Sequence, residues 1–263
     1  MTVGDVLRWL DGIAPFATQE SFDNAGLIVG DPAAEVRRVL FAVDATLPVV
    51  REAADWGAEL IVAHHPLLFG GTSAIRYDEP EGKIVAALAA GRLNLIAAHT
   101  NLDRAPGGTG DSLAAALRLG EIAPAGEDPY LRVGRLAQPV TALDFLNTVD
   151  SALGARARLY GDASRPVRRI AVGAGACGER YALAAQNGAE AFVVGEIKHH
   201  QLLASLALGL PVLEAGHYET ERPGVVALLE RFQSAARDAQ WPVRARLTAI
   251  SPYDCATSDG RRA

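Results

Sequence analysis

The chain has 263 residues, of which 25 are Lys or Arg and 31 are Asp or Glu, so its formal net charge at pH 7 is −6. Hydrophobic residues make up 49% of the chain and charged residues 21%, a balance typical of a folded protein rather than a disordered one. An acidic chain lacks the surplus of positive charge that general nucleic-acid binding needs, so we expect no nucleic-acid partner.

Neither a membrane span nor a disulfide framework is expected. The longest uncharged apolar run, residues 201–213, contains a proline and falls short of the roughly 20 residues that a spanning helix needs. Asp5 and Arg8 interrupt the apolar residues near the N-terminus, so we expect no signal peptide. Cys177 and Cys255 are far apart and form no CxxC pair, which favours a cytoplasmic protein.

Two stretches of the chain follow one pattern. Each begins with an Arg-Arg strand, continues through a helix that ends in Gly-Ala-Glu, and enters a second buried strand. These segments are 37–43, 57–59 and 60–63 in the first stretch, and 168–172, 188–190 and 191–194 in the second. The offsets agree, since 168 − 37 and 188 − 57 are both 131. Short apolar runs that alternate with helices predict βαβ units and a parallel sheet.

A third matched block makes an internal duplication the favoured interpretation. Residues 91–104 and 209–222 align with an offset of 118, and the alignment places a His-x3-Asp motif opposite a His-x3-Glu motif. We therefore predict an α/β fold of two similar halves. The expected divisions are a first half over 1–124, a second half over 125–224, and a helix and strand over 225–263 that pack back on the first half, with the Pro/Gly-rich segment 123–128 as the boundary.

Donor residues follow the predicted strands. All six histidines lie directly after a strand or at the start of the next segment, and in parallel α/β sheets that carboxyl end is where ligands bind. We expect three of these histidines and two carboxylates to converge on one cleft, namely His64, His65, Asp103, His217 and Glu221. Three imidazoles and two carboxylates exceed what one tetrahedral ion needs, and they fit two divalent ions (Zn, Mn, Fe, Co or Ni) that share a carboxylate.

The remaining histidines have plainer interpretations as well. His99 alone is typical of a hydrogen-bonded residue beside a site, and the run Lys198, His199 and His200 is typical of a polar helix start. If these residues act in the site, proton transfer and contact with a substrate anion are the roles that suit them.

A competing motif is Gly173-Ala-Gly-Ala-Cys-Gly178, a GxGxxG after a strand and before a helix. Such a turn can admit a pyrophosphate to a helix N-terminus, so a dinucleotide-binding oxidoreductase is one alternative. The equivalent turn of the first stretch, residues 44–48, has no glycine, and Gly and Ala are abundant throughout. A tight turn is the favoured interpretation. The chain contains no GxxxxGK[ST] and no GxSxG motif.

Taken together, five motifs resemble the Nif-three-like dinuclear metal-binding family, whose members include the GTP cyclohydrolase 1 type 2 homologues. The motifs are DNAGL at 23–27, HHP at 64–66, HTNLD at 99–103, GEIKHH at 195–200 and GHYETE at 216–221. The sequence departs from the family's usual pattern at Phe22, where a Trp is common, and at Gly110, where an Asn is common.

The resemblance implies a two-domain α/β fold with a dinuclear metal site in the cleft between the halves, and assembly into a homohexamer. It implies that His64, His65, Asp103, His217 and Glu221 are the metal ligands. We expect His65 and Asp103 on one ion and His64 and His217 on the other, with Glu221 bridging them. We expect a metal-dependent hydrolase that acts on a nucleotide or phosphoester, with GTP ring opening as the named candidate. The alternative is a non-catalytic hexameric scaffold that stores metal or regulates a partner.

Overall fold

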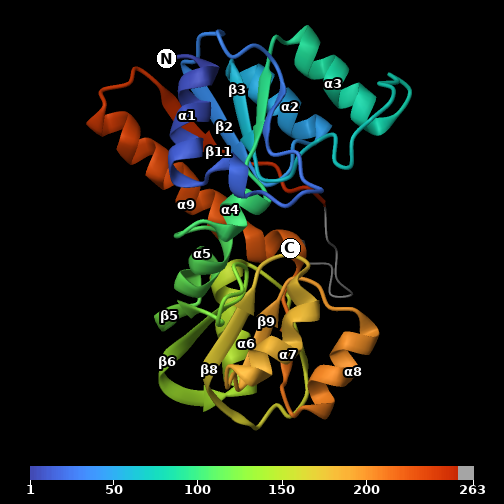
Figure 1. The fold of residues 1–263 in the computed structure, drawn as a ribbon, viewed down its shortest axis with the longest axis vertical. Helices are drawn as coiled ribbons and strands as arrows, with labels where there is room; N and C mark the ends of the chain where they lie inside the picture. Colours follow the sequence, from blue (N-terminus) through green and yellow to red (C-terminus); the bar gives the residue numbers. More distant parts are fainter. Residues whose placement is uncertain (254–263) are drawn as a thin grey trace. The chain divides into compact units, whose positions relative to one another are not determined.

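A computed structural model describes residues 1–253, and Cys255 lies outside the described residues. The chain forms two compact units (Figure 1). Unit 1 comprises Met1–Gly108 and Val225–Tyr253, and unit 2 comprises Thr109–Gly224. Both are mixed α/β structures, each built on one sheet. No helix in the described part of the chain is long and apolar enough to cross a membrane.

Unit 1 contains a five-stranded sheet with the order β1-β4-β3-β2-β11. Its elements are α1 (Val3–Ile13), the 3-10 helix η1 (Phe16–Thr18), β1 (Gly26–Val29), β2 (Arg38–Ala42), α2 (Leu47–Trp56), β3 (Leu60–Ala63), α3 (Pro80–Ala90), β4 (Asn94–Ala97), α4 (Thr100–Arg104) and β11 (Arg244–Leu247). β4, β3, β2 and β11 run parallel, whereas β1 pairs antiparallel with β4 at one edge. The sheet is therefore mixed, and the predicted parallel pairing holds for its other four strands.

Helices cover both faces of the unit 1 sheet. On one face, α2 and α3 pack on alternate residues of β2 and β3 such as Leu40 and Ile61. On the other face, the buried Phe41 ring of β2 lies 5.5 Å from the Phe232 ring of α9 (His217–Asp238), and Trp9 of α1 lies 5.0 Å from Phe232. Because the sheet is buried on both faces, its central strands are continuous apolar runs.

Unit 2 contains a six-stranded sheet with the order β5-β6-β8-β9-β10-β7. Its elements are α5 (Thr109–Ala116), β5 (Gly120–Pro124), β6 (Arg132–Thr141), α6 (Ala142–Leu153), β7 (Arg158–Tyr160), β8 (Pro166–Gly173), the 3-10 helix η2 (Cys177–Arg180), α7 (Tyr181–Gln186), β9 (Ala191–Val194), α8 (His199–Ala207) and β10 (Val212–Glu214). β8, β9 and β10 are parallel, and β5, β6 and β7 join them in antiparallel pairings. Residues 123–128, expected to be a boundary, lie at the end of β5 and in the connection to β6 within this sheet.

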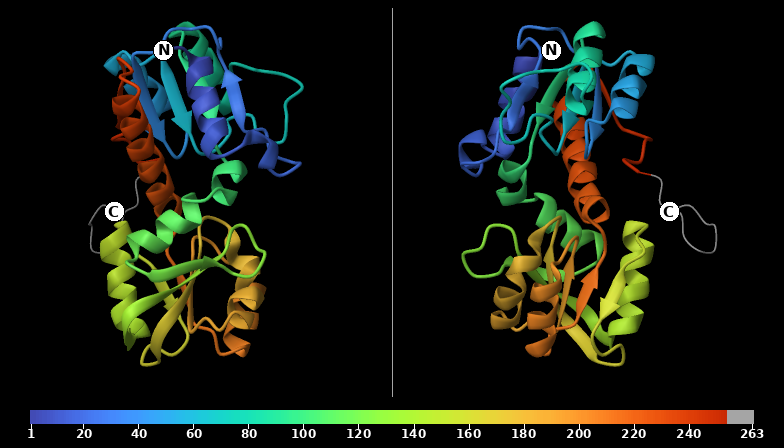
Figure 2. Two further views of the ribbon diagram at one scale, coloured as in Figure 1. Left: turned by 60° about the vertical axis from the view of Figure 1, so that its left-hand side comes forward. Right: turned by 90° about the vertical axis from the view of Figure 1, so that its right-hand side faces the viewer.

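The unit 2 sheet also has a helix layer on each face (Figure 2). Residues Ile170 and Val172 of β8 pack with α5 and α6, whereas Ala171 between them packs with α7 and α8. This alternation follows from the two-residue period of a strand. Each face has its own core of fully buried side chains, with Phe145 in one and Phe192 in the other.

The two Gly-Ala-Glu segments have the same local structure in their own units. In unit 1, Glu59 Oε2 accepts hydrogen bonds from the backbone N–H groups of Arg37 and Arg38, at 3.0 and 2.8 Å. In unit 2, Glu190 Oε2 accepts hydrogen bonds from the N–H groups of Arg168 and Arg169, at 2.6 and 2.9 Å. The preceding glycines, Gly57 and Gly188, adopt φ of 69° and 72°, which favours glycine and ends each helix.

Candidate metal centre

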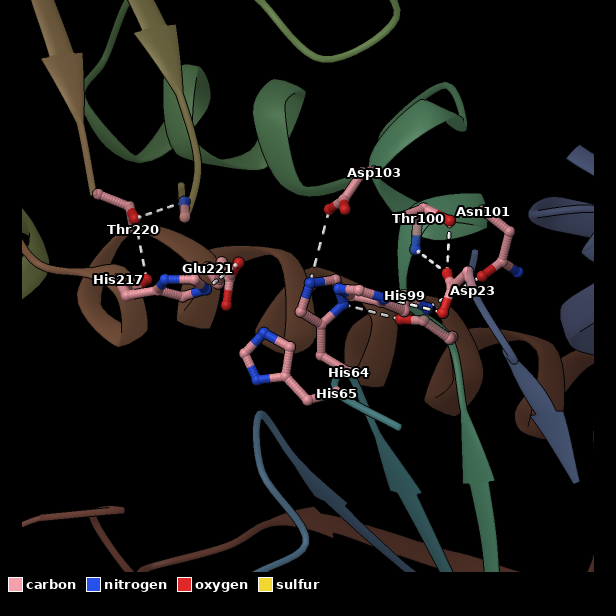
Figure 3. A network of polar contacts seen from close by, with 12 residues as sticks. Asp23, His64, His65, His99, Thr100, Asn101, Asp103, His217, Thr220 and Glu221 are labelled. Atoms are coloured by element: carbon pink, nitrogen blue, oxygen red, sulfur yellow. Dashed lines mark hydrogen bonds and ion pairs between the residues drawn. The ribbon is translucent and has the colours of Figure 1, made fainter. Parts of the chain in front are cut away.

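Three histidines and an aspartate gather beyond the carboxyl ends of two adjacent strands of unit 1 (Figure 3). His64 and His65 directly follow β3, and His99 follows β4 and caps the N-terminus of α4. Each histidine offers one ring nitrogen, and the three nitrogens lie within 4.8 Å of one another. Asp103, one turn into α4, places Oδ1 3.6 Å from His64 Nε2.

Backbone pairing fixes the direction of the two adjacent histidines. The N–H groups of His64 and His65 both donate to the carbonyl of Val43, at 3.0 and 2.9 Å, so the chain turns at the end of β3 instead of continuing as a strand. Neighbouring residues in a regular strand point to opposite faces. The turn allows both imidazoles to face the same side, where their ring centroids lie 5.0 Å apart.

Each unit 1 histidine has an oxygen acceptor at Nδ1. His64 Nδ1 lies 2.7 Å from the carbonyl oxygen of Ala98, and His65 Nδ1 lies 2.8 Å from Asp44 Oδ1. His99 Nδ1 lies 3.0 Å from Asp23 Oδ1. A carbonyl or carboxylate oxygen can only accept a hydrogen bond, so Nδ1 is the donor in each of these contacts. Histidine ligands of metal ions are oriented in this way.

Asp23, the acceptor that faces His99, is itself fixed by further hydrogen bonds. Its carboxylate is fully buried and accepts hydrogen bonds from the backbone N–H and hydroxyl of Thr100 as well as facing His99. Burial raises the pKa of Asp23, but the hydrogen bonds from His99 and Thr100 outweigh burial and hold this pKa well below its usual range. Asp23 is therefore ionised, and it fixes the His99 ring in place.

A second donor pair lies in unit 2, at the start of α9. His217 and Glu221 are one helical turn apart, and His217 Nε2 lies 2.9 Å from Glu221 Oε1 (Figure 3). His217 Nδ1 lies 3.0 Å from Glu196 Oε1, so this imidazole also has a carboxylate acceptor at Nδ1. Glu221 is buried, whereas Glu196 is largely exposed.

The glycine-rich turn of unit 2 makes room for this pair. Gly175 has φ of +60°, and a Cβ there would lie 2.2 Å from Glu221 Oε1 and 3.1 Å from His217 Nε2. The backbone N–H of Gly175 also donates to Thr220 Oγ1 at 3.0 Å. A Cβ on Gly178 would lie 2.6 Å from the carbonyl oxygen of Glu196. The GxGxxG glycines therefore allow close packing around His217 and Glu221, which explains the motif as a tight turn.

The donor chemistry of both groups fits a divalent cation. With the Nδ1 proton directed at Glu196, His217 Nε2 and Glu221 Oε1 face each other as two acceptors, so a proton or a cation must lie against them. Imidazole nitrogens with carboxylate oxygens are the usual ligands of Zn, Mn, Fe, Co and Ni.

The other predicted site residues lie at the start of α8. Lys198 precedes the helix, and His199 and His200 begin it, with all three side chains exposed. Neither histidine belongs to a cluster of three or more metal-type donors within residues 1–253. The sequence analysis assigned no orienting role to Asp44 or Glu196. Both lie two residues beyond the end of a strand, β2 and β9 respectively, and a carboxylate in that position is the signal that could have indicated the role.

The comparisons with known proteins agree on one family. The family model described as Duf34/NIF3 (NGG1p interacting factor 3) matches residues 1–252. A Clostridium perfringens protein named GTP cyclohydrolase 1 type 2 homolog is 33% identical over 240 residues, which are 89% of this chain and 92% of that protein. A Streptomyces coelicolor protein of the same name is 35% identical over 233 residues, covering 84% and 82%.

Solved structures show the same fold. A hypothetical protein of Staphylococcus aureus matches with a TM-score of 0.91 and 28% identity, over 96% of this chain and 98% of that one. A Bacillus cereus protein related to NIF3 matches over the same shares with a TM-score of 0.92 and 21% identity.

Proposed function

Because the chain belongs to the Duf34/NIF3 family, we propose that it binds two divalent metal ions and uses them to hydrolyse a nucleotide or a phosphoester. One observation carries this proposal. Four histidines in the two donor groups each place Nδ1 between 2.7 and 3.0 Å from an oxygen atom of a carbonyl or carboxylate. Metal-binding histidines are oriented in this way, because the acceptor at Nδ1 fixes the tautomer and the direction of the ring.

The proposed ligands are the three histidines and two carboxylates that the sequence singled out. We propose that His65 and Asp103 would hold one ion and that His64 and His217 would hold the other, with Glu221 as a ligand shared by both. When bound, two such ions would lower the pKa of a water molecule toward neutrality and stabilise negative charge that develops on the substrate. Zn, Mn, Fe, Co and Ni all suit this ligand set.

Other residues of the chain prepare the ligands and the substrate. Asp44 and Glu196 hold His65 and His217 in the required tautomer. Lys198, His199 and His200 are exposed and cationic or titratable, so they suit contact with a substrate anion or delivery of a proton. GTP is the first substrate to test because curated relatives carry the name GTP cyclohydrolase 1 type 2 homolog.

The proposal extends to the architecture. We propose that the two units arose by duplication, and the matching hydrogen bonds of Glu59 and Glu190 support this. We also propose that the chain acts in the cytoplasm as a homohexamer. Size-exclusion chromatography with light scattering tests the assembly, since a hexamer has a mass six times that of the 27.7 kDa chain.

An activity screen tests the hydrolase directly. The metal-reconstituted protein is assayed against nucleotides, including GTP, and against phosphodiesters, with Glu221→Gln as the inactive control. Turnover that requires metal and is lost in Glu221→Gln supports the proposal. Tight metal binding without turnover of any of these substrates would instead favour a scaffold that stores metal or regulates a partner.

A further inference from the structure

We infer that Phe22 and Phe69 form a subsite beside the histidine group of unit 1, and that this subsite stacks a planar aromatic ring of the substrate. A nucleotide is then preferred over a phosphoester that has no such ring. This inference rests on the proposed function and selects one of the two substrate classes proposed there. All the residues that carry it belong to unit 1.

Two phenylalanine rings lie together on the surface of unit 1. Of the phenylalanines within residues 1–253, Phe22 and Phe69 are the exposed ones, at 60% and 54% exposure. Their ring centroids lie 6.0 Å apart, and the ring planes are nearly perpendicular, at 79°. A single exposed apolar side chain is ordinary, whereas exposed apolar side chains that contact one another are typical of a surface that binds a ligand or a partner.

The two rings adjoin the histidine group. The Phe69 ring lies 5.7 Å from the His99 ring, measured between centroids, and the two planes meet at 86°. Phe22 directly precedes Asp23, whose Oδ1 lies 3.0 Å from His99 Nδ1 (Figure 3). Both rings are therefore positioned relative to the same histidine. A ligand that reaches the histidine group can contact the ring pair at the same time.

Hydrogen bonds fix the two segments that carry the rings. The N–H of Asp23 donates to the carbonyl three residues earlier at 2.9 Å, so Phe22 lies within a turn. Asn24 Nδ2 donates at 3.0 Å to the carbonyl of Leu68, the residue before Phe69. The two segments are thereby held together, although 44 positions separate Asn24 from Leu68. Because the rings stand on ordered backbone, a ligand that binds them orders little further chain.

Space for a ligand adjoins the Phe69 ring. After Phe69 the chain reverses at Gly70 and Gly71, whose φ of +80° and +79° glycine adopts without strain. The segment that follows forms a pocket of about 290 Å³, and its wall includes Phe69, Ile75 and Arg76. This volume is near the lower limit of ligand pockets, ~300 Å³, so the pocket suits one small planar group rather than a large ligand.

The chemistry of the pair selects an aromatic ligand. A phenylalanine ring has no hydrogen-bonding group, so it binds through ring contact and exclusion of water, and every nucleobase offers a face for such contact. A protein partner suits the pair less well, because two half-exposed rings offer far less apolar surface than the ~800 Å² per partner of a stable interface. The phosphate of a nucleotide held here would extend to the histidine group, where bound metal stabilises negative charge.

The experiment compares ligands with and without a base. Isothermal titration measures the affinity of the full, Zn²⁺-loaded chain for GMP, AMP and ribose 5-phosphate. We expect the wild type to bind both nucleotides more tightly than ribose 5-phosphate. Phe69→Leu keeps an apolar side chain but removes the ring, so it should lower the affinity for GMP and AMP at least ~5-fold, the smallest usual effect of losing one stacking contact. Its affinity for ribose 5-phosphate should equal that of the wild type.

Further variants separate stacking from a general loss of structure. Phe22→Leu is expected to act in the same direction as Phe69→Leu, and Phe69→Tyr, which keeps the ring, should bind both nucleotides as the wild type does. The matched control is Tyr253→Leu, which removes a ring of similar exposure, 49%, outside the two segments, and should change no affinity. A defect in folding would weaken all three ligands alike, so the difference between nucleotide and ribose 5-phosphate isolates the contact with the base.

The outcomes separate this inference from the proposed function. The inference is overturned if the wild type binds GMP and AMP no more tightly than ribose 5-phosphate, if Phe69→Leu binds the nucleotides as the wild type does, or if it weakens all three ligands equally. A change of assembled mass in Phe69→Leu with nucleotide affinity intact would show that a second copy covers the rings, and also overturns it. The proposed function is judged separately, by divalent-ion binding and by turnover in the activity screen.

Discussion

Gly175 and Glu221 approach each other so closely that a Cβ on the glycine would lie 2.2 Å from Oε1 of the carboxylate. No real Cβ tolerates that distance, so any side chain at position 175 must displace Glu221 or the turn. The glycine in the middle of the GxGxxG motif therefore leaves the space that Glu221, a proposed metal ligand 46 residues further along the chain (221 − 175 = 46), occupies. A substitution there tests the ligand role of Glu221 without changing any donor.

We expect Gly175→Ala to lower the affinity for the ion held by His217 and Glu221 by ~10-fold or more, as misplacement of a ligand does. The matched control is Gly154→Ala, because Gly154 also has positive φ (+64°) but has no atom within 4 Å of the Cβ position. In both variants an alanine must adopt a left-handed backbone conformation, which is expected to lower the free energy of unfolding by about 1–2 kcal/mol. Equal metal affinity in the two variants, measured by chelator competition, would contradict the account.

We expect Glu196→Gln to weaken metal binding by ~10–100-fold because His217 would lose the carboxylate that holds its Nδ1 proton. Glu196 is 60% exposed, so the substitution should leave the melting temperature nearly unchanged. Glu127→Gln, another exposed glutamate of unit 2, is the control and should change neither property. Isothermal titration with Zn²⁺ measures the affinity. If the affinity of Glu196→Gln equals that of the wild type, Glu196 does not orient His217 for metal binding.

Glu190 predicts a pH-dependent contribution to stability. Burial raises the pKa of Glu190, but hydrogen bonds from the N–H groups of Arg169 and Arg168, with nearby arginine charges, outweigh it and lower the pKa from its ordinary value of 4.5. A carboxyl whose pKa is lower in the folded state stabilises the fold above its unfolded pKa, and this stabilisation is lost as the pH falls through the folded value.

We therefore expect Glu190→Gln to reduce the free energy of unfolding by about 1–2 kcal/mol at pH 7, the usual worth of hydrogen bonds to a charged acceptor. The difference from wild type should shrink as the pH falls below 4.5. Urea unfolding between pH 3 and 7 measures both values. A difference that stays constant over this range would show that the charge of Glu190 contributes nothing.

The strands that carry the donors could be predicted from the sequence. The apolar run at residues 60–63 coincides with β3, and the placement of His64 and His65 directly after it follows from that run alone. The Arg-Arg and Gly-Ala-Glu segments likewise fall on β2, β8 and the ends of α2 and α7. Short buried strands between helices are a strong local signal, so these elements need no tertiary information.

The orienting contacts could not be predicted in the same way. The two residues of each contact are far apart in the sequence: Asp44 and His65 are separated by 21 positions, Glu196 and His217 by 21, and Asp23 and His99 by 76. Each contact depends on which strands become neighbours, and sequence spacing does not specify that. The antiparallel edge strands β1, β5 and β7 were also missed, because a strand at the edge of a sheet carries a weaker hydropathy pattern, as β5 shows with all five residues exposed.

The central claim is that His64, His65, Asp103, His217 and Glu221 bind one pair of ions. Anomalous diffraction from crystals of the protein reconstituted with Zn²⁺ or Mn²⁺, collected at the absorption edge of the metal, tests this claim most directly. The account predicts two anomalous peaks roughly 3.5–4 Å apart, the separation typical of two-metal sites, with these five side chains as ligands. A single peak, or two peaks more than about 10 Å apart and therefore without a shared ligand, would contradict it.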